Sequence, residues 1–234
     1  MKENDFFKEL ENIGILLNEQ QKNQFSKYAD FLIEYNEHTN LTAIKKREDI
    51  YLKHFFDSLL LYKFVKISDE KVLDIGSGAG FPGVPLKIVF PKIKLTLLDS
   101  NGKKAKFLEE LKDRLNFDFT IINDRAEVYV NRVRESFDIV TSRAVTAMPI
   151  LSELSLPYVK IGGKFIAYKG QIDDTLENGL IAIKTLGGEV ENVYSDIMPI
   201  ENAARTFVCV VKKCKTDEIY PRKFDKINKK PLQN

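Results

Sequence analysis

An acid and three glycines stand close together in the segment "VLDIGSGAGFPGVPL", residues 72–86. Asp74 lies within a short apolar run, and Gly76, Gly78 and Gly80 follow at alternate positions. Glycine adopts positive φ readily and has no Cβ, so a turn of this composition lets backbone N–H groups approach a ligand closely. A helix that follows such a turn adds a partly positive N-terminus. The segment therefore predicts a binding site for a nucleotide-like ligand.

This turn differs from two common phosphate-binding motifs. No GK[ST] closes it, which excludes a P-loop, and Phe81 stands where the dinucleotide motif GxGxxG needs its third glycine. A nicotinamide-dependent reductase is therefore disfavoured. Asp99 closes the next apolar run, 23 residues after Gly76. An acid at that place can accept hydrogen bonds from both hydroxyls of a ribose, which indicates a ligand that carries this sugar.

The elements that must position these residues alternate along the chain. Short apolar runs predict seven strands, at 72–75, 95–98, 119–122, 137–140, 164–168, 190–194 and 207–211. Helices are predicted between them near 83–90, 102–116, 148–159 and 174–186. This alternation predicts an α/β fold with a doubly wound, mostly parallel sheet, whose ligands bind beyond the carboxyl ends of the strands. The last two runs have no convincing helix between them, so we expect one antiparallel strand.

The residues before this region predict a helical extension. Asn18 can cap a helix with Gln21 in the capping-box position, and apolar residues then recur at three- and four-residue spacing. A second helix is expected over about 47–62. We therefore predict three parts: a helical extension over 1–66, a ligand-binding core over 67–213 and a basic tail over 214–234.

Composition and charge narrow the class of protein. Of 234 residues, 30% are charged, yet the formal net charge is only +2. From residue 212 to the end there are eight Lys or Arg and three Asp or Glu, a net charge of +5. We expect no membrane span and no secretory signal. Cys209 and Cys214 form no CxxC pair and are too few for a zinc site, so we expect reduced thiols, no metal and a cytoplasmic protein.

The motifs in combination resemble one family. DxGxGxG with a later acid is similar to the first motif of class I S-adenosylmethionine-dependent methyltransferases, which implies a Rossmann-like core. The segments "HFFDSL", "DIGSGAGFPGVPL", "LLDSNGKKAKFL", "DRAE", "SRAV", "YKG" and "YPR" look like the bacterial ribosomal RNA small subunit methyltransferase G family, also called glucose-inhibited division protein B. The resemblance covers about 40 to 230. It implies methylation of N7 of a guanine in 16S ribosomal RNA, with S-adenosyl-L-methionine as the cofactor.

The resemblance also implies a set of cofactor-binding residues. They are Asp74, Gly76, Ser77, Gly78, Gly80, Phe81, Asp99, Ala126, Glu127 and Arg143. Within this set, Asp99 would hold the ribose, Ala126 and Glu127 would lie on the adenine side, and Arg143 would lie on the cofactor side. Simpler alternatives stay open: Phe81 as plain core, Glu127 as an exposed acid at a helix start, and Arg143 in a structural salt bridge.

Four residues are candidates for a catalytic role. Arg143 and Lys169 each follow an apolar strand, on the side where ligands are expected. His54 and Asp57 are three residues apart on one helix face and could form a pair that roofs the cofactor pocket. Helix packing for His54 and Asp57, and structural pairing for Lys169, are the competing interpretations.

The implied reaction needs few groups. Guanine N7 has a lone pair and no proton to remove, so a general base is unnecessary. Alignment of N7 with the bond between sulfur and methyl could supply most of the catalysis, since orientation contributes roughly 7–11 kcal/mol. Residues 141–144 read Thr-Ser-Arg-Ala instead of the [DN]PP[YF] motif of enzymes that methylate amino nitrogens. That difference favours a ring nitrogen as the acceptor.

The RNA substrate needs a positive surface. The candidates for RNA binding are Lys103, Lys104, Arg222, Lys223, Lys229 and Lys230. The tail departs from the family after "YPRK", where "FDKINKKPL" replaces an expected Gly-x-Pro stretch, so its conformation is open and a solvated, disordered tail is the alternative. The expected partner is 16S RNA or the small subunit, and we expect a monomer. A methyltransferase for another RNA or a small molecule, and a non-catalytic binding module, remain competing hypotheses.

Overall fold

A computed structural model describes residues 1–143, 146–170 and 175–233. Its strands form one seven-stranded sheet in the order β3-β2-β1-β4-β5-β7-β6. Their bounds are β1 Lys71–Ile75, β2 Lys94–Leu98, β3 Thr120–Ile122, β4 Phe137–Arg143, β5 Val159–Lys169, β6 Gly188–Ile197 and β7 Ala204–Lys212. Each predicted apolar run overlaps one of these strands, and the predicted α/β fold class is confirmed.

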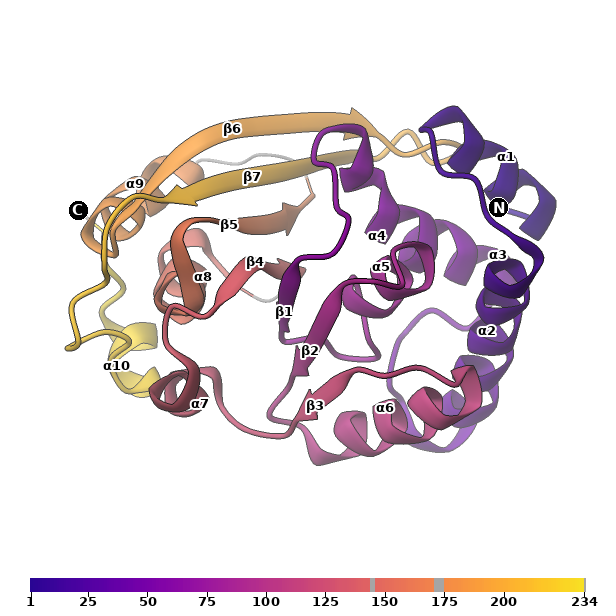
Figure 1. Ribbon diagram of the computed structural model, residues 1–234, viewed down its shortest axis with the longest axis horizontal. Helices are drawn as coiled ribbons and strands as arrows, with labels where there is room; N and C mark the ends of the chain where they lie inside the picture. The colour runs from indigo at the N-terminus through magenta and orange to yellow at the C-terminus, as the bar shows by residue number, and fades with distance from the viewer. Residues whose placement is uncertain (144–145, 171–174, 234) are drawn as a thin grey trace. The chain divides into compact units, whose positions relative to one another are not determined.

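The antiparallel strand is β7. It lies between β5 and β6 and is antiparallel to both, with Ala167 of β5 opposite Val208 of β7. The strand β4 is parallel to β1 and to β5. The tight connection between β6 and β7 explains the reversal, because strands joined by a short turn pair antiparallel. β6 therefore forms the edge of the sheet, and the last strand of the chain lies one place inside it (Figure 1).

The chain divides into two compact units. Unit 1 comprises Met1–Glu70 and Ser77–Asn123, and unit 2 comprises Lys71–Gly76 and Asp124–Asn234. The predicted division at residues 66 and 213 stays a prediction.

Unit 1 is rich in helices. They are α1 Glu3–Asn12, α2 Glu19–Thr39, α3 Arg47–Ile50, α4 Asp57–Leu59, α5 Gly83–Val89 and α6 Gly102–Leu115. α2 packs against α5 and α6. Asn18 and Gln21 form the predicted capping box at the start of α2, with 2.9 Å between Asn18 Oδ1 and the backbone N of Gln21. The core of this unit is aromatic: Phe6, Phe25 and Phe55 are fully buried. The centroid of the Phe25 ring lies 5.1 Å from the centroids of the other two rings, which are 6.2 Å apart.

The predicted helix over 47–62 has an irregular centre. α3 leads into a π-helical segment, Tyr51–Phe56, then α4, and finally a 3₁₀ turn, Leu60–Lys63. π-helical turns are uncommon and are often found at functional sites. His54 lies in this segment and Asp57 begins α4.

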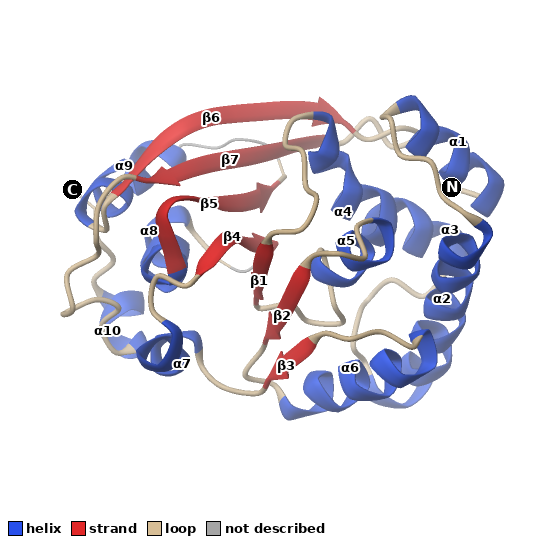
Figure 2. Ribbon diagram, in the orientation of Figure 1, coloured by secondary structure: helices blue, strands red, loops and turns tan. Residues whose placement is uncertain are grey.

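Unit 2 contains four further helices among its described residues. They are α7 Ala126–Val133, α8 Met148–Ser155, α9 Thr175–Thr185 and α10 Phe224–Lys229. Figure 2 shows β4, β5, β7 and β6 side by side with these helices around them. The sequence did not predict α7 or α10. The helix predicted to reach 159 ends at Ser155, because a 3₁₀ turn, Leu156–Tyr158, leads directly into β5. Residue 174, the predicted start of α9, lies outside the described residues.

The middle of β5 forms the centre of the unit 2 core. Phe165, Ile166 and Ala167 are fully buried, as are Phe207 and Val210 of the neighbouring β7. This continuous burial is typical of strands covered on both faces. None of the helices in the described ranges is long and apolar enough to cross a membrane.

Candidate functional site

The glycine turn of unit 1 is held tightly by its own backbone. The N–H groups of Gly80 and Phe81 donate to the carbonyl of Ser77, at 2.8 and 2.9 Å. Gly80 has φ +98°, and a Cβ at this position would lie 2.7 Å from Val84 Cγ2 and 2.8 Å from the Tyr28 hydroxyl. Both the backbone conformation and the close approach of side chains therefore require glycine here.

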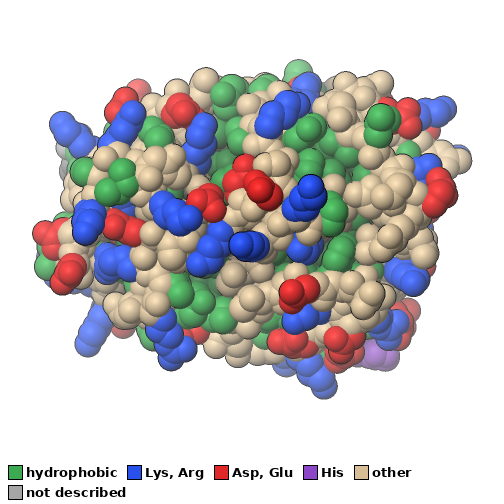
Figure 3. Space-filling view, in the orientation of Figure 1, with side chains coloured by type: hydrophobic (Ala, Val, Ile, Leu, Met, Phe, Trp, Pro, Cys, Tyr) green, Lys and Arg blue, Asp and Glu red, His purple; other side chains and the backbone are tan. Residues whose placement is uncertain are grey.

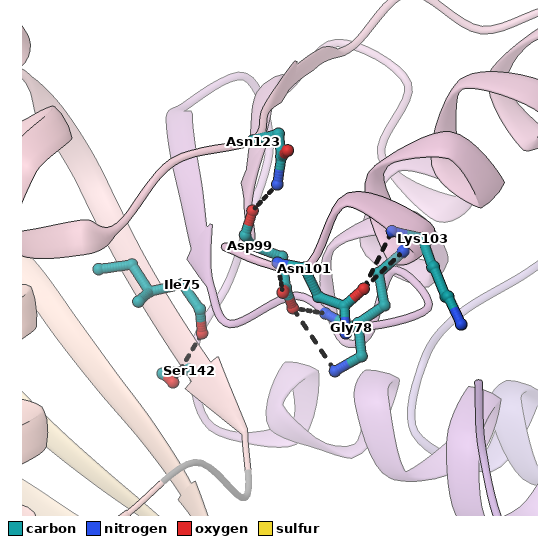
Figure 4. Close-up of polar contacts among 8 residues, drawn as sticks. Ile75, Gly78, Asp99, Asn101, Lys103, Asn123 and Ser142 are labelled. Atoms are coloured by element: carbon teal, nitrogen blue, oxygen red, sulfur yellow. Dashed lines mark hydrogen bonds and ion pairs between the residues drawn. The ribbon is translucent and has the colours of Figure 1, made fainter. Parts of the chain in front are cut away.

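Asp99 fastens this turn to the end of β2. Its Oδ2 accepts a hydrogen bond from Gly78 N at 2.9 Å, and its Oδ1 accepts one from Asn101 N at 2.9 Å (Figure 4). Only 9% of the Asp99 side chain is exposed. A carboxylate offers about four lone-pair positions. Each oxygen of Asp99 therefore keeps the capacity to accept one further hydrogen bond, as a pair of ribose hydroxyls would require.

Two asparagines that sequence reasoning missed complete this arrangement. Asn101 Oδ1 caps α6 by accepting from Lys103 N at 3.0 Å, and Asn123 Nδ2 donates to the Asp99 carbonyl at 2.9 Å (Figure 4). An asparagine directly before a helical pattern is a recognisable N-cap, so Asn101 could have been found. Asn123 carries no such signal, because its contact depends on how β3 aligns with β2.

The two lysines predicted at this helix differ in position. Lys104 Nζ lies 3.8 Å from Asp99 Oδ2, so Lys104 forms an ion pair with the acid that is predicted to bind the ribose. Lys103 is exposed at the first turn of α6. The geometry therefore leaves Lys103 as the better candidate for an RNA phosphate.

Phe81 stacks with aromatic side chains from the N-terminal helices. Its ring centroid lies 4.3 Å from that of His54 and 5.4 Å from that of Tyr28, with interplanar angles of 12° and 14°. Thr42 Oγ1 lies 3.0 Å from His54 Nε2, and the Tyr28 hydroxyl donates to the Ala79 carbonyl. The helical extension and the glycine turn are thus packed together within unit 1. Asp57, the other predicted member of the His54 pair, is buried at the start of α4.

In unit 2 the strand order reverses at β1 and β4, which lie next to each other. In open α/β sheets, ligands bind outside the carboxyl ends of the strands at such a switch point. Asp74 of β1 is fully buried opposite Thr141 of β4. The Ser142 hydroxyl donates to the Ile75 carbonyl at 2.8 Å and fastens the carboxyl ends of both strands (Figure 4). Gly76 follows with φ +68°.

Arg143 and Lys169 end neighbouring parallel strands. Arg143 of β4 lies opposite Tyr168 of β5, so Lys169 is one residue further along at the same edge. Lys169 Nζ donates to the carbonyl of Thr146. The structure therefore brings these two predicted residues to one edge of the sheet, where Lys169 is bonded to Thr146.

Ala126 and Glu127 form the first turn of α7. The Ala126 carbonyl accepts a hydrogen bond from the Tyr158 hydroxyl at 2.5 Å. Burial raises the pKa of Tyr158 well above its ordinary value, so this hydroxyl remains protonated and donates. The Glu127 side chain is 11% exposed, and its Oε1 lies 3.7 Å from Arg125 Nη1. Glu127 is therefore not the freely exposed acid of the simpler alternative.

The basic tail is folded in the described residues, and Arg222 is engaged within it. Arg222 Nε and Nη2 donate to Glu153 Oε1 and Oε2 at 2.8 and 2.6 Å, and the Glu153 side chain is fully buried. The predicted candidates Lys223, Lys229 and Lys230 are exposed. At the left of Figure 3, over α7 and α10, several Lys and Arg side chains lie on the surface with Asp and Glu side chains between them. Arg222 therefore attaches the tail to Glu153 of α8. The exposed positive charges of the tail include its lysines.

Among the residues with described positions, no group of three or more His, Cys, Asp or Glu could hold a metal ion.

Solved structures similar to this chain include methyltransferases. A methyltransferase from Pyrococcus furiosus superposes with a TM-score of 0.59 and 15% identity, covering 82% of this chain and 99% of its own. The M. jannaschii TYW2 structure, described as a complex with AdoMet, superposes with a TM-score of 0.52 and 13% identity, covering 63% of this chain and 70% of its own. At these identities the likeness establishes the fold.

Some proteins are much more similar to this chain in sequence. Ribosomal RNA small subunit methyltransferase G of Bacillus cytotoxicus is 45% identical over 225 residues, 94% of each chain. The protein of the same name from Oceanobacillus iheyensis is 45% identical over 238 aligned positions, the full length of both chains. The family model described as GidB, rRNA small subunit methyltransferase G, matches residues 21–198. This chain therefore belongs to the rRNA small subunit methyltransferase G family.

Proposed function

We propose that this chain transfers a methyl group from S-adenosyl-L-methionine to N7 of a guanine in 16S ribosomal RNA. The single observation that carries this proposal is Asp99, a largely buried carboxylate that fastens the glycine turn and keeps acceptor capacity on both oxygens. Membership of the methyltransferase G family supplies the class of substrate.

The chemistry of the glycine turn fits the cofactor. The Ser77 hydroxyl is buried without a hydrogen-bond partner among the described residues. A buried hydroxyl normally has a partner, so a polar group of a bound molecule would satisfy it. When bound, S-adenosyl-L-methionine supplies a methyl group on a positively charged sulfur. In our proposal Asp99 accepts from its ribose, and Gly76, Gly78 and Gly80 let the backbone lie close to it.

The residues of unit 2 take the remaining roles. Arg143, at the carboxyl end of β4, pairs with the cofactor carboxylate, while the buried Asp74 orders the turn or meets its ammonium group. Ala126 and Glu127 hold the adenine. Lys169 keeps the segment after β4 in place through the Thr146 carbonyl, and so helps to orient the guanine.

The helical extension acts on the same turn. His54 and Tyr28 stack on Phe81, and the Thr42 hydroxyl sets the orientation of the His54 ring. We assign His54 to supporting the turn instead of moving a proton, because attack by N7 releases no proton. Asp57, buried beside the π-helical segment, belongs to the same support.

The RNA is held by exposed cations. Lys223, Lys229 and Lys230 flank or belong to α10, and Lys103 starts α6. Contacts with phosphates make binding depend steeply on salt. We further propose that the protein acts as a monomer in the cytoplasm, where ribosomal RNA is modified, and sedimentation of the purified protein tests the first point.

Methyl transfer tests this function. Purified protein and labelled S-adenosylmethionine are incubated with naked 16S RNA, or with small subunits from cells that lack the modification, and the nucleosides are analysed. We expect label in 7-methylguanosine, and the better of the two substrates shows whether ribosomal proteins present the guanine. No transfer to either substrate, with cofactor binding intact, would contradict the proposal and direct attention to small-molecule acceptors.

A further inference from the structure

The C-terminal segment is packed against the start of α7. α10 contributes Ile227, which is fully buried against Ile150 and Leu154 of α8. Phe224 of α10 and Ala126, the first residue of α7, pack on the same cluster. The tail therefore contacts two helices of unit 2 and reaches the residue that we place on the adenine side of the cofactor.

A second attachment fixes the chain just before α10. Glu153 of α8 accepts three hydrogen bonds from Arg222, one from its backbone N at 2.9 Å and two from its guanidinium at 2.8 and 2.6 Å. Arg134 Nη2 also donates to the Tyr220 carbonyl at 2.6 Å. Paired, charge-assisted hydrogen bonds to a fully buried carboxylate define both position and angle. α10 thus begins from a fixed point.

The start of α7 lacks a cap of its own. Its N-cap residue, Arg125, makes no side-chain hydrogen bond to the free N–H groups of the first turn. The Arg125 guanidinium lies 5.8 Å from the centroid of the Phe224 ring and 3.7 Å from the Glu127 carboxylate. Contacts with other elements must therefore hold this turn in place, because an uncapped helix end is only weakly fixed by its own sequence.

We propose that Phe224 and Ile227 are positioning residues for recognition of adenine. They fix the position of the first turn of α7 by two sets of contacts. Ala126 packs in the same apolar cluster, and Arg125, which lies near the Phe224 ring, orients Glu127. This inference rests on the proposed function, because it takes Ala126 and Glu127 as the adenine contacts. It gives the last residues of the chain a part in cofactor selection, in addition to RNA binding by their lysines.

A comparison of two ligands tests the inference. S-adenosylhomocysteine and S-inosylhomocysteine share the sugar and the amino acid but differ at the 6-position of the base. Their affinities are measured by calorimetry for wild type, Phe224→Ala and Val210→Ala. Val210 is a fully buried residue of β7 and serves as the control for loss of core volume. We expect the wild-type preference for adenine to fall about tenfold in Phe224→Ala, the equivalent of about one hydrogen bond, and to persist in Val210→Ala.

Each result of this comparison supports or overturns the inference. An unchanged preference in a folded Phe224→Ala protein overturns the inference, and so does an equal loss in Val210→Ala. If Phe224→Ala does not fold, Phe224→Leu makes the decision, because leucine keeps an apolar side chain in the cluster but removes the ring that lies 5.8 Å from the Arg125 guanidinium: a reduced preference supports the inference and an unchanged one overturns it. Failure of the wild type to bind either ligand would instead refute the proposed function.

Discussion

In our proposal Asp99 has two tasks: it shapes the glycine turn and it accepts hydrogen bonds from the ribose of the cofactor. Its two oxygens already accept backbone N–H groups from Gly78 and Asn101, so it shapes the turn after β1 and the start of α6. The same oxygens have the remaining lone pairs for a ribose. A carboxylate that is fixed before the ligand arrives loses little freedom on binding, which favours affinity.

Replacement of Asp99 should therefore weaken cofactor binding. Hydrogen bonds to a charged group contribute about 1.5–3 kcal/mol each, so Asp99→Ala should raise the Kd for S-adenosylmethionine by a factor of at least about 10. Asp99→Asn keeps one carbonyl oxygen and should fall between this variant and wild type. Isothermal titration calorimetry measures both. Asp113→Ala, which removes an exposed acid of α6, is the control, and equal affinity of Asp99→Ala and wild type would refute the role.

Some contacts of single residues could be predicted, and others could not. The capping box of Asn18 and Gln21 depends on neighbours in the chain, and the sequence showed it. The pair of Arg222 and Glu153 spans 69 residues and joins a tail to a buried helix face. Charge alone placed Arg222 with the RNA-binding lysines. Only the folded structure shows that the Arg222 guanidinium is bonded to Glu153.

At the scale of elements, the sheet was predictable and the smaller helices were not. Short apolar runs mark the central strands, because a strand that is covered on both faces consists of buried apolar residues. α7 and α10 have only eight and six residues, which is too short to show a clear helical periodicity, and α10 is also mostly polar. They are stabilised by packing on α8, which sequence patterns do not show. The position of β7 between β5 and β6 could likewise not be predicted from the spacing of apolar residues.

The amino ends of three strands are fastened by one acid. Asp138 of β4 accepts from Lys71 N of β1 and from Lys160 Nζ of β5, each at 2.8 Å. Burial by itself raises the pKa of Asp138, but the hydrogen bonds from Lys160 and Lys71 outweigh it and leave that pKa below its usual value. The carboxylate form is thus favoured by the folded state.

This gives a definite dependence of stability on pH. Because the pKa of Asp138 is lowered by folding, its stabilising contribution is present above the unfolded pKa of about 4 and is lost as pH falls through the folded value. The difference in free energy of unfolding between wild type and Asp138→Asn should be largest near neutral pH and should shrink below about pH 4. Urea unfolding at several pH values measures it, with Asp113→Asn as the control. A difference that stays constant down to acidic pH would show that Asp138 does not act through this ion pair.

In the whole molecule, the positive charge is concentrated near the C-terminal end of the sequence. The formal net charge is +2, while residues 212–234 carry +5. The described part of this tail is ordered on α8, so its lysines are displayed on a fixed surface. A fixed surface orients RNA with less loss of entropy than a disordered arm would. The same segment packs against the start of α7, so in our proposal RNA binding and cofactor binding depend on one element.

We propose that this chain methylates N7 of a guanine in 16S RNA by means of a cofactor held at Asp99. The most direct measurement is mass spectrometry of 16S RNA from a bacterial strain that lacks its own enzyme and expresses this chain. We predict that wild type restores 7-methylguanosine at a single guanine and that Asp99→Ala, at equal protein level, restores far less. Unmodified 16S RNA in cells that contain the folded wild-type protein would show that this chain is not the methyltransferase for that guanine.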